Sequence, residues 1–169
     1  MTSLSSLNSS DQTAFVAALG HLFEHSPWVA EETWMKRPFA DAAKLHAALC
    51  ATMRGASREK QLALIRAHPD LAGRLAQQKK LTAESTLEQA SAGLDQLTDA
   101  ELAAFTLQND SYKAKFGFPF IICARLNAKS AIITAMHTRV SNSPGTEFNT
   151  ALGEIEKIAW LRLQDAVQG

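Results

Sequence analysis

Apolar residues recur every three or four positions along nearly the whole chain, a spacing typical of amphipathic helices. The first such stretch carries Phe15, Leu19 and Phe23 on one side. Ser9 or Ser10 can cap the start of this helix. The repeated pattern predicts an all-α fold of about eight to ten helices.

Several of the expected helices have marked ends. Thr98 and Glu101 form a capping box, which predicts a long helix reaching Lys115. Thr82 can cap a helix that runs to about Ala92. The other expected helices span about residues 28–37, 41–53, 57–68, 71–78, 128–140 and 146–167.

Residues 116–122, with the sequence Phe-Gly-Phe-Pro-Phe-Ile-Ile, interrupt the helical pattern. Gly117 permits close approach of the backbone and Pro119 stiffens it, so we expect an irregular, rigid turn over residues 117–120. A strand near Ile121 would have no evident partner. The turn could present backbone groups to a ligand or simply pack in the core, and the sequence leaves both open.

The length of 169 residues suits one domain with a sizeable core, and no internal repeat or low-complexity linker divides it. We therefore expect a single domain over residues 1–169. The Ser-rich first residues are not expected to be a secretory signal, and residues 1–9 are expected to be flexible.

Lys and Arg together number 17, as do Asp and Glu, so the formal net charge is zero. Without a basic excess or a long apolar run, the chain is expected to bind neither nucleic acid nor a membrane. Cys50 and Cys123 lie in apolar surroundings without metal-type or Cys-x-x-Cys spacing. Two reduced, buried thiols in a cytoplasmic protein are the simplest interpretation.

His68 lies at the junction of two expected helices. It follows Leu64 by four residues and Ile65 by three, so it falls on their buried side. Pro69 disfavours helical backbone at His68 and suits the first position of a new helix. An imidazole fixed there is a candidate acid–base group. The alternative is a core histidine that is hydrogen-bonded to a backbone carbonyl.

Ser85, Glu88 and Gln89 share one helical face, because they are spaced i, i+3 and i+4. A hydroxyl, a carboxylate and an amide on one face suit a small, nitrogen-rich polar ligand. The alternative is an ordinary solvated helix face.

Arg162 continues the apolar stripe of the last helix, after Ile155 and Ala159. A buried arginine is costly unless it meets a carboxylate or a bound anion. Arg162 could form an ion pair with Glu88 or Asp70, or it could contact a ligand. One forked guanidinium could make both interactions at once.

The sequence contains no cluster of His, Cys and carboxylates at metal-ligand spacing, no glycine-rich phosphate loop and no nucleophile motif. We therefore expect neither a metal nor a cofactor, and any chemistry would be cofactor-independent.

Together these features resemble the family of 2-oxo-4-hydroxy-4-carboxy-5-ureidoimidazoline (OHCU) decarboxylases. The resemblance covers almost the whole chain in the order of the family. It rests on the segments 23–30, 37–39, 67–71, 85–90, 92–94, 105–112, 116–120 and 161–163, among them Ala-His-Pro-Asp-Leu, Ser-x-x-Glu-Gln-Ala and Phe-Gly-Phe-Pro-Phe.

The resemblance implies an all-α enzyme that converts OHCU to (S)-allantoin in urate degradation, without a cofactor. It makes His68 the acid–base residue, Glu88 its catalytic partner and Arg162 a substrate-binding residue. The remaining substrate-binding residues it implies are Pro69, Ser85, Gln89, Phe120, Ile121 and Ile122. It also leads us to expect a homodimer.

Two other classes of protein stay open at this stage. One is a non-catalytic, all-helical binding module for a small ureide or a partner helix. The other is a helical metalloprotein, which the absence of ligand spacing disfavours.

Overall fold

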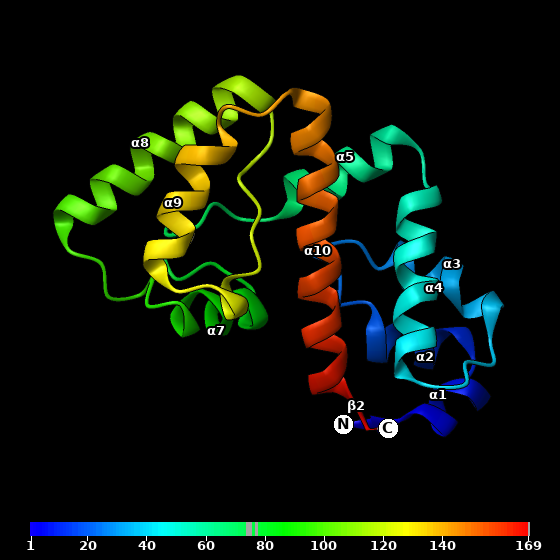
Figure 1. The fold of residues 1–169 in the computed structure, drawn as a ribbon. Coiled ribbons are helices and arrows are strands. Elements are labelled where there is room, and N and C mark those ends of the chain that lie inside the picture. Colours follow the sequence, from blue (N-terminus) through cyan, green and yellow to red (C-terminus); the bar gives the residue numbers. More distant parts are fainter. Residues whose placement is uncertain (74–75, 77, 169) are drawn as a thin grey trace. The chain divides into compact units, whose positions relative to one another are not determined.

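The structure is a computed structural model, and it describes residues 1–73, 76 and 78–168. Nine α-helices and two 3-10 helices occur in this part of the chain, and its only strands are two residues long. The prediction of an all-α fold is confirmed (Figure 1). The helix expected over residues 71–78 includes positions 74, 75 and 77 and lies outside the described residues.

The chain divides into two compact units, and the first comprises Met1–Ala67 and Glu156–Gly169. Its core is built from fully buried apolar side chains, among them Phe15, Leu19, Leu45, Leu49 and Leu64. Its elements are β1 (Thr2–Ser3), α1 (Leu4–Ser9), α2 (Gln12–Leu19), α3 (Trp28–Thr33), the 3-10 helix η1 (Trp34–Lys36), α4 (Ala42–Gly55), α5 (Arg58–Ala67), the last part of α10 (Pro144–Ala166) and β2 (Val167–Gln168).

The first residues are more regular than we expected. Thr2 pairs with Val167 in a parallel β1–β2 ladder, which brings the two termini side by side (Figure 1). Leu7 of α1 is only 1% exposed, so burial of this side chain holds α1 against the unit. Residues 1–9 therefore form a short strand and a helix where the sequence suggested flexibility.

Helix α2 begins later than predicted. Asp11, not Ser9 or Ser10, is the N-cap, and its carboxylate accepts a hydrogen bond from the backbone N–H of Ala14 at 2.8 Å. The helix ends at Leu19, so Phe23 is buried in a loop and not on a helical face.

The second unit comprises His68–Ile155. Buried apolar residues of this unit include Phe105, Tyr112, Ile132, Met136 and Phe148. Its elements are α7 (Ala83–Ser91), α8 (Asp99–Phe116), the 3-10 helix η2 (Ala124–Leu126), α9 (Lys129–Arg139) and the first part of α10.

The capping residues predicted for α7 and α8 are confirmed. The Thr98 hydroxyl accepts from the N–H of Glu101, and the Glu101 carboxylate accepts from the N–H of Thr98, which completes the capping box of α8. Thr82 caps α7 through the N–H of Ser85. Gly117 ends α8 with a φ of 75°, a left-handed conformation that glycine adopts without strain.

Residues 117–123 belong to neither a helix nor a strand. The aromatic side chains of the segment pack in a cluster, with the Tyr112 and Phe120 rings edge to face and their centres 5.3 Å apart. Phe118 in turn lies edge to face with Phe148, at 6.2 Å. The rigidity of this segment stays a prediction.

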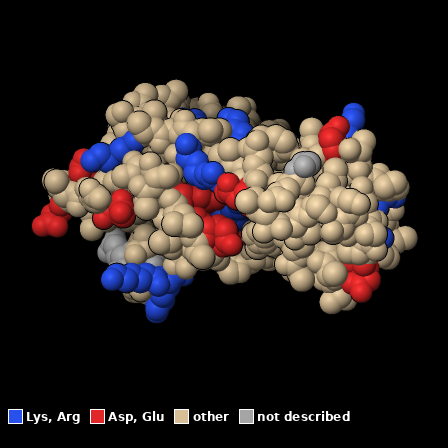
Figure 2. Space-filling model, turned by 90° about the horizontal axis from the view of Figure 1, so that it is seen from below, with Lys and Arg blue, Asp and Glu red and all other residues tan. Residues whose placement is uncertain are grey.

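No helix in the described residues is both long enough and apolar enough to cross a membrane. On the face seen in Figure 2, acidic and basic side chains appear in small groups separated by uncharged residues. Neither sign of charge dominates that face, in agreement with the balanced composition.

Candidate functional site

His68 is the first residue after α5 and is 8% exposed. Leu64 and Ile65, which lie four and three residues before it in α5, are fully buried. Pro69 follows in a half-buried segment that is neither helix nor strand. The helix break and the inward position of His68 therefore agree with the sequence pattern.

Three hydrogen bonds hold the turn that follows Pro69. The N–H of Ala72 donates to Gln89 Oε1 at 2.8 Å. Asn109 Nδ2 donates to the carbonyl oxygen of Leu71 at 2.9 Å. Lys113 Nζ donates to Asp70 Oδ2 at 2.6 Å. The turn is thus tied to α7 through Gln89 and to α8 through Asn109 and Lys113.

The polar face of α7 is largely buried. Ser85 is 5% exposed and Gln89 6% exposed, while Glu88 is half-buried. The interpretation as a solvated helix face is therefore wrong for Ser85 and Gln89. Because burying polar side chains is costly, these two must be satisfied by the protein or by a ligand.

The segment around Ile121 carries backbone groups that could bind a ligand. Phe120, Ile121 and Ile122 are 1%, 3% and 8% exposed. Among the described residues, the N–H groups of Ile121 and Ile122 have no hydrogen-bond partner. The next N–H, of Cys123, donates to Glu154 Oε2 at 2.8 Å. Two buried backbone donors thus lie next to each other.

The second unit brings three of the predicted site segments together. Helix α7 packs against η2, which directly follows Cys123 (Figure 1). The hydrogen bond between Gln89 and Ala72 joins the same helix to the turn after His68. The segments around residues 68, 85–89 and 120–122 are therefore linked through α7.

Arg162 lies in the first unit and is 3% exposed. Its Nη2 donates to Glu24 Oε2 at 3.1 Å and its Nη1 to the carbonyl oxygen of His21 at 3.2 Å. Asp70, one partner we had considered, is bonded to Lys113 instead. Glu24 was not predicted as the partner of Arg162, because it lies in a loop with no helical period. The available signal was its place in segment 23–30, which carries part of the family resemblance.

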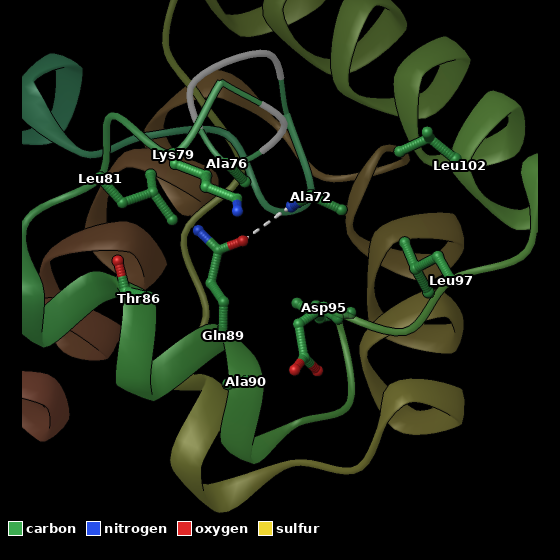
Figure 3. Close-up of a pocket in the computed structure, with 11 residues that line it drawn as sticks. Ala72, Ala76, Lys79, Leu81, Thr86, Gln89, Ala90, Asp95, Leu97 and Leu102 are labelled. Atoms are coloured by element: carbon green, nitrogen blue, oxygen red, sulfur yellow. Dashed lines mark hydrogen bonds between the residues drawn. The ribbon is translucent and has the colours of Figure 1, made fainter.

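A cavity of about 500 Å³ lies on another side of α7, lined by Thr86, Gln89 and Ala90 of that helix (Figure 3). Lys79 and Asp95 provide charges at its wall, and the other described residues that line it are apolar. At about 100° per residue, this face is turned by roughly a third of a turn from the face of Ser85 and Glu88. Of the predicted site residues only Gln89 lines the cavity.

Among the described residues there is no group of three or more His, Cys, Asp or Glu side chains that could hold a metal ion. The predicted site residues of the second unit instead carry an imidazole, a hydroxyl, a carboxylate, an amide and two backbone N–H groups. In a helical protein, groups of these kinds suit a small polar molecule.

The comparisons with known proteins define the family. A family model described as OHCU decarboxylase matches residues 8–164. The OHCU decarboxylase of Halalkalicoccus jeotgali is 46% identical over 159 residues, which is 94% of this chain and 88% of the relative. That of Haloferax volcanii is 44% identical, over 96% of this chain and 94% of the relative. This chain belongs to the OHCU decarboxylase family.

Two solved structures resemble the fold. A crystal structure of (S)-allantoin synthase is 31% identical with a TM-score of 0.78, over 99% of this chain. This chain spans 54% of that longer chain. An OHCU decarboxylase crystallised in the presence of (S)-allantoin is 22% identical, with a TM-score of 0.69 over 92% of this chain and 97% of the other. The second likeness shows the fold alone.

Proposed function

We infer that this chain catalyses the cofactor-independent decarboxylation of OHCU to (S)-allantoin, a step in urate degradation. The observation that carries this conclusion is the family match over residues 8–164, since that range includes every residue expected at the site. The identity of 46% to an OHCU decarboxylase over most of both chains supports the same reaction.

The substrate itself explains why no cofactor is needed. Its carboxylate is attached to a carbon that also carries a hydroxyl group and adjoins ring unsaturation. When the C–C bond breaks and CO₂ leaves, the electron pair spreads into the ring. The protein must orient the carboxylate out of the ring plane, move a proton at the hydroxyl group and protonate the new carbanion on one face.

We propose that His68 moves these protons and that Glu88 is its catalytic partner. His68 is held inward at the end of α5, and a positioned acid–base group contributes roughly 10²–10⁴-fold to a rate. The bond between Gln89 and the turn after His68 supports placing the α7 face close to it. A carboxylate beside the imidazole would favour its protonated form.

The remaining site residues would bind the substrate. Ser85 and Gln89 offer buried polar groups, and the N–H groups of Ile121 and Ile122 suit carbonyl or carboxylate oxygens. Pro69 and Phe120 would contribute apolar contacts. We propose that Arg162 binds the substrate carboxylate or a carbonyl while it keeps its bond to Glu24, as a forked guanidinium allows.

The direct test of this assignment is the variant His68→Gln. Glutamine keeps a polar side chain but cannot accept or release a proton as an acid–base group near neutral pH. We expect the variant to lose at least about 100-fold in kcat on freshly generated OHCU, while its far-ultraviolet circular dichroism stays that of the wild type. Near-wild-type turnover by folded His68→Gln would refute the role of His68.

We further propose that residues 1–169 form one functional domain and act in the cytoplasm as a homodimer, without binding nucleic acid. The family match across both units supports the single domain, and the zero net charge supports the absence of nucleic-acid binding. Light scattering coupled to size exclusion would test the dimer: a mass of about 18.4 kDa would contradict it.

A further inference from the structure

Arg139, at the end of α9, contacts two neighbouring residues of the expected substrate-binding segment. Its Nη1 donates to the carbonyl oxygen of Ile121 at 2.7 Å. Its guanidinium carbon lies 4.3 Å from the ring centre of Phe120, a cation–π distance. Among the described residues, residues 118–122 take part in no backbone–backbone hydrogen bond, so side chains must hold this stretch.

Arg139 is itself held by Glu147, which is completely buried. Its Nε donates to Glu147 Oε1 at 2.8 Å, and its Nη2 bonds to the same oxygen. The Tyr112 hydroxyl also donates to Oε1, and Asn142 Nδ2 donates to Oε2 at 2.8 Å. Tyr112, Arg139 and Asn142 therefore cluster around the buried Glu147 carboxylate, and we call these four residues the arginine clamp.

Tyr112 links the arginine clamp to the aromatic packing of the segment. Burial, reinforced by the nearby Glu147 carboxylate, raises the pKa of Tyr112, so its hydroxyl remains a neutral hydrogen-bond donor. Its ring meets the ring of Phe120 edge to face, as described above. Phe120 thus contacts two members of the clamp, Arg139 and Tyr112.

Stability by itself does not explain the ion pair of the clamp. A buried ion pair recovers little more than its own desolvation cost, and apolar side chains of similar volume often serve as well. The aromatic cluster already fills this region with apolar side chains. What only the guanidinium adds is a directed bond to one backbone carbonyl, that of Ile121.

We propose that Arg139 is a positioning residue for the reaction: held by Glu147, it fixes residues 120–122 so that the N–H groups of Ile121 and Ile122 face the substrate. This inference rests on the proposed decarboxylase function. Arg139 acts through the backbone of this segment and needs no contact with OHCU.

The variants Arg139→Lys and Arg139→Met of the full chain test the proposal. A lysine keeps the charge beside Glu147, but its single ammonium cannot reproduce both the fork to Glu147 and the bond to Ile121. We expect Arg139→Lys to recover most of the thermal stability that Arg139→Met loses. We expect kcat/KM for OHCU to stay lower by about 10- to 100-fold in both variants, the loss typical of a misplaced group.

The variant Lys129→Met is the matched control. Lys129 lies on the same helix and pairs with Glu101 of α8 at 2.6 Å, at the opposite end of α9 from Arg139. Its loss removes a cation from an ion pair between α8 and α9 without touching residues 120–122. We expect a small loss of stability and wild-type values of kcat and KM.

Hydrogen exchange of residues 117–123 provides a readout that needs no substrate. The proposal predicts exchange at least about tenfold faster in the folded Arg139→Lys variant than in wild type or Lys129→Met. If the wild type does not accelerate OHCU loss but exchange still rises, the proposed function fails and the positioning of the segment stands. Unchanged exchange, or wild-type kcat/KM in folded Arg139→Lys, would overturn the proposal. If Arg139→Met does not fold, Arg139→Lys alone decides.

Discussion

In the first unit, Arg162 and Glu24 form a buried ion pair whose contribution to stability can be tested by replacing one residue. Both residues are 3% exposed, and their charged groups are 3.1 Å apart. Removing one partner of such a pair leaves an uncompensated buried charge, which costs about 3–5 kcal/mol. The arginine therefore has a structural role whatever it does with the substrate.

We accordingly expect Arg162→Ala to lower the free energy of unfolding by about 3–5 kcal/mol, measured by urea denaturation. The double variant Arg162→Met/Glu24→Gln removes both charges and should recover part of that loss. If the double variant is stable and still has the wild-type KM for OHCU, Arg162 is structural only. If its KM rises, Arg162 also binds the substrate.

Cys50 illustrates a residue whose environment suppresses reactivity. Its Sγ lies 3.3 Å from His46 Nε2, a pairing that can activate a thiol. Burial, followed by the Glu156 carboxylate, instead raises the pKa of Cys50 from 9.0 to about 12, against the opposing effect of Arg54. Cys50 is therefore a thiol, not a thiolate, at neutral pH.

We expect iodoacetamide to modify Cys50 at least about tenfold more slowly in the native protein than in urea near pH 8.5, the ordinary pKa of a thiol. Because the folded state holds this proton more tightly, the resulting stabilisation is complete below pH 9.0 and is lost as the pH rises toward about 12. Cys50→Ser should lack that alkaline loss. Rapid native alkylation at Cys50 would contradict this account.

At the residue scale, the sequence predicted those positions that lie on a periodic pattern. The inward position of His68 follows from Leu64 and Ile65, and the shared face of Ser85 and Gln89 follows from their spacing. Glu24 could not be predicted, because it lies in a loop between α2 and α3, where no period shows which side chains point inward.

The start of α8 shows how one capping residue can serve two elements. Glu101 accepts from the N–H of Thr98 and from Lys129 Nζ of α9, at 2.9 and 2.6 Å. The hydrogen bond with Lys129, followed by that with Thr98, lowers the pKa of Glu101 from 4.5 to about 2. The cap therefore also connects α8 to α9.

Because the pKa of Glu101 is depressed, its stabilising effect is present above pH 4.5 and is lost as the pH falls toward about 2. Glu101→Gln keeps an acceptor for Thr98 but cannot titrate. We therefore expect this variant to lose less stability than the wild type between pH 4.5 and about 2. Lys129→Met removes the largest cause and should reduce the loss similarly. Acid titrations of unfolding by circular dichroism measure both, and a wild-type profile in both variants would contradict the assignment.

At the element scale, helices with a capping signal were predicted to within about a residue or two, as α7 and α8 show. Helix α2 was misplaced at its start, because Ser9, Ser10 and Asp11 are all good caps and only the native packing selects Asp11. The course of residues 117–123 could not be derived, because it depends on Arg139 and Glu154, which are distant in sequence.

At the scale of the whole molecule, the family match extends over both compact units. The order of the short motifs along the chain was what identified the family from the sequence, since no single motif is specific. Hydrophobic periodicity predicted the fold class but could not reveal the division at residues 67 and 68, because it reports which side of a helix is buried and not what covers it.

The proposed chemistry also predicts how the whole enzyme responds to chelation. The electron pair released on loss of CO₂ is accepted by the substrate ring, so no metal has to stabilise it. We expect dialysis against a chelator to leave kcat and KM for OHCU unchanged, with metal content checked by elemental analysis. A loss of activity restored by one added metal would contradict cofactor independence.

The most direct test of the central claim is an assay that starts from urate and generates OHCU in place. The ultraviolet decay of OHCU is followed with and without this protein, and the handedness of the allantoin is measured by circular dichroism. We predict faster decay than the spontaneous reaction and a product that is (S)-allantoin. Tight binding of allantoin with decay at the spontaneous rate and a racemic product would show a binding module and contradict the account.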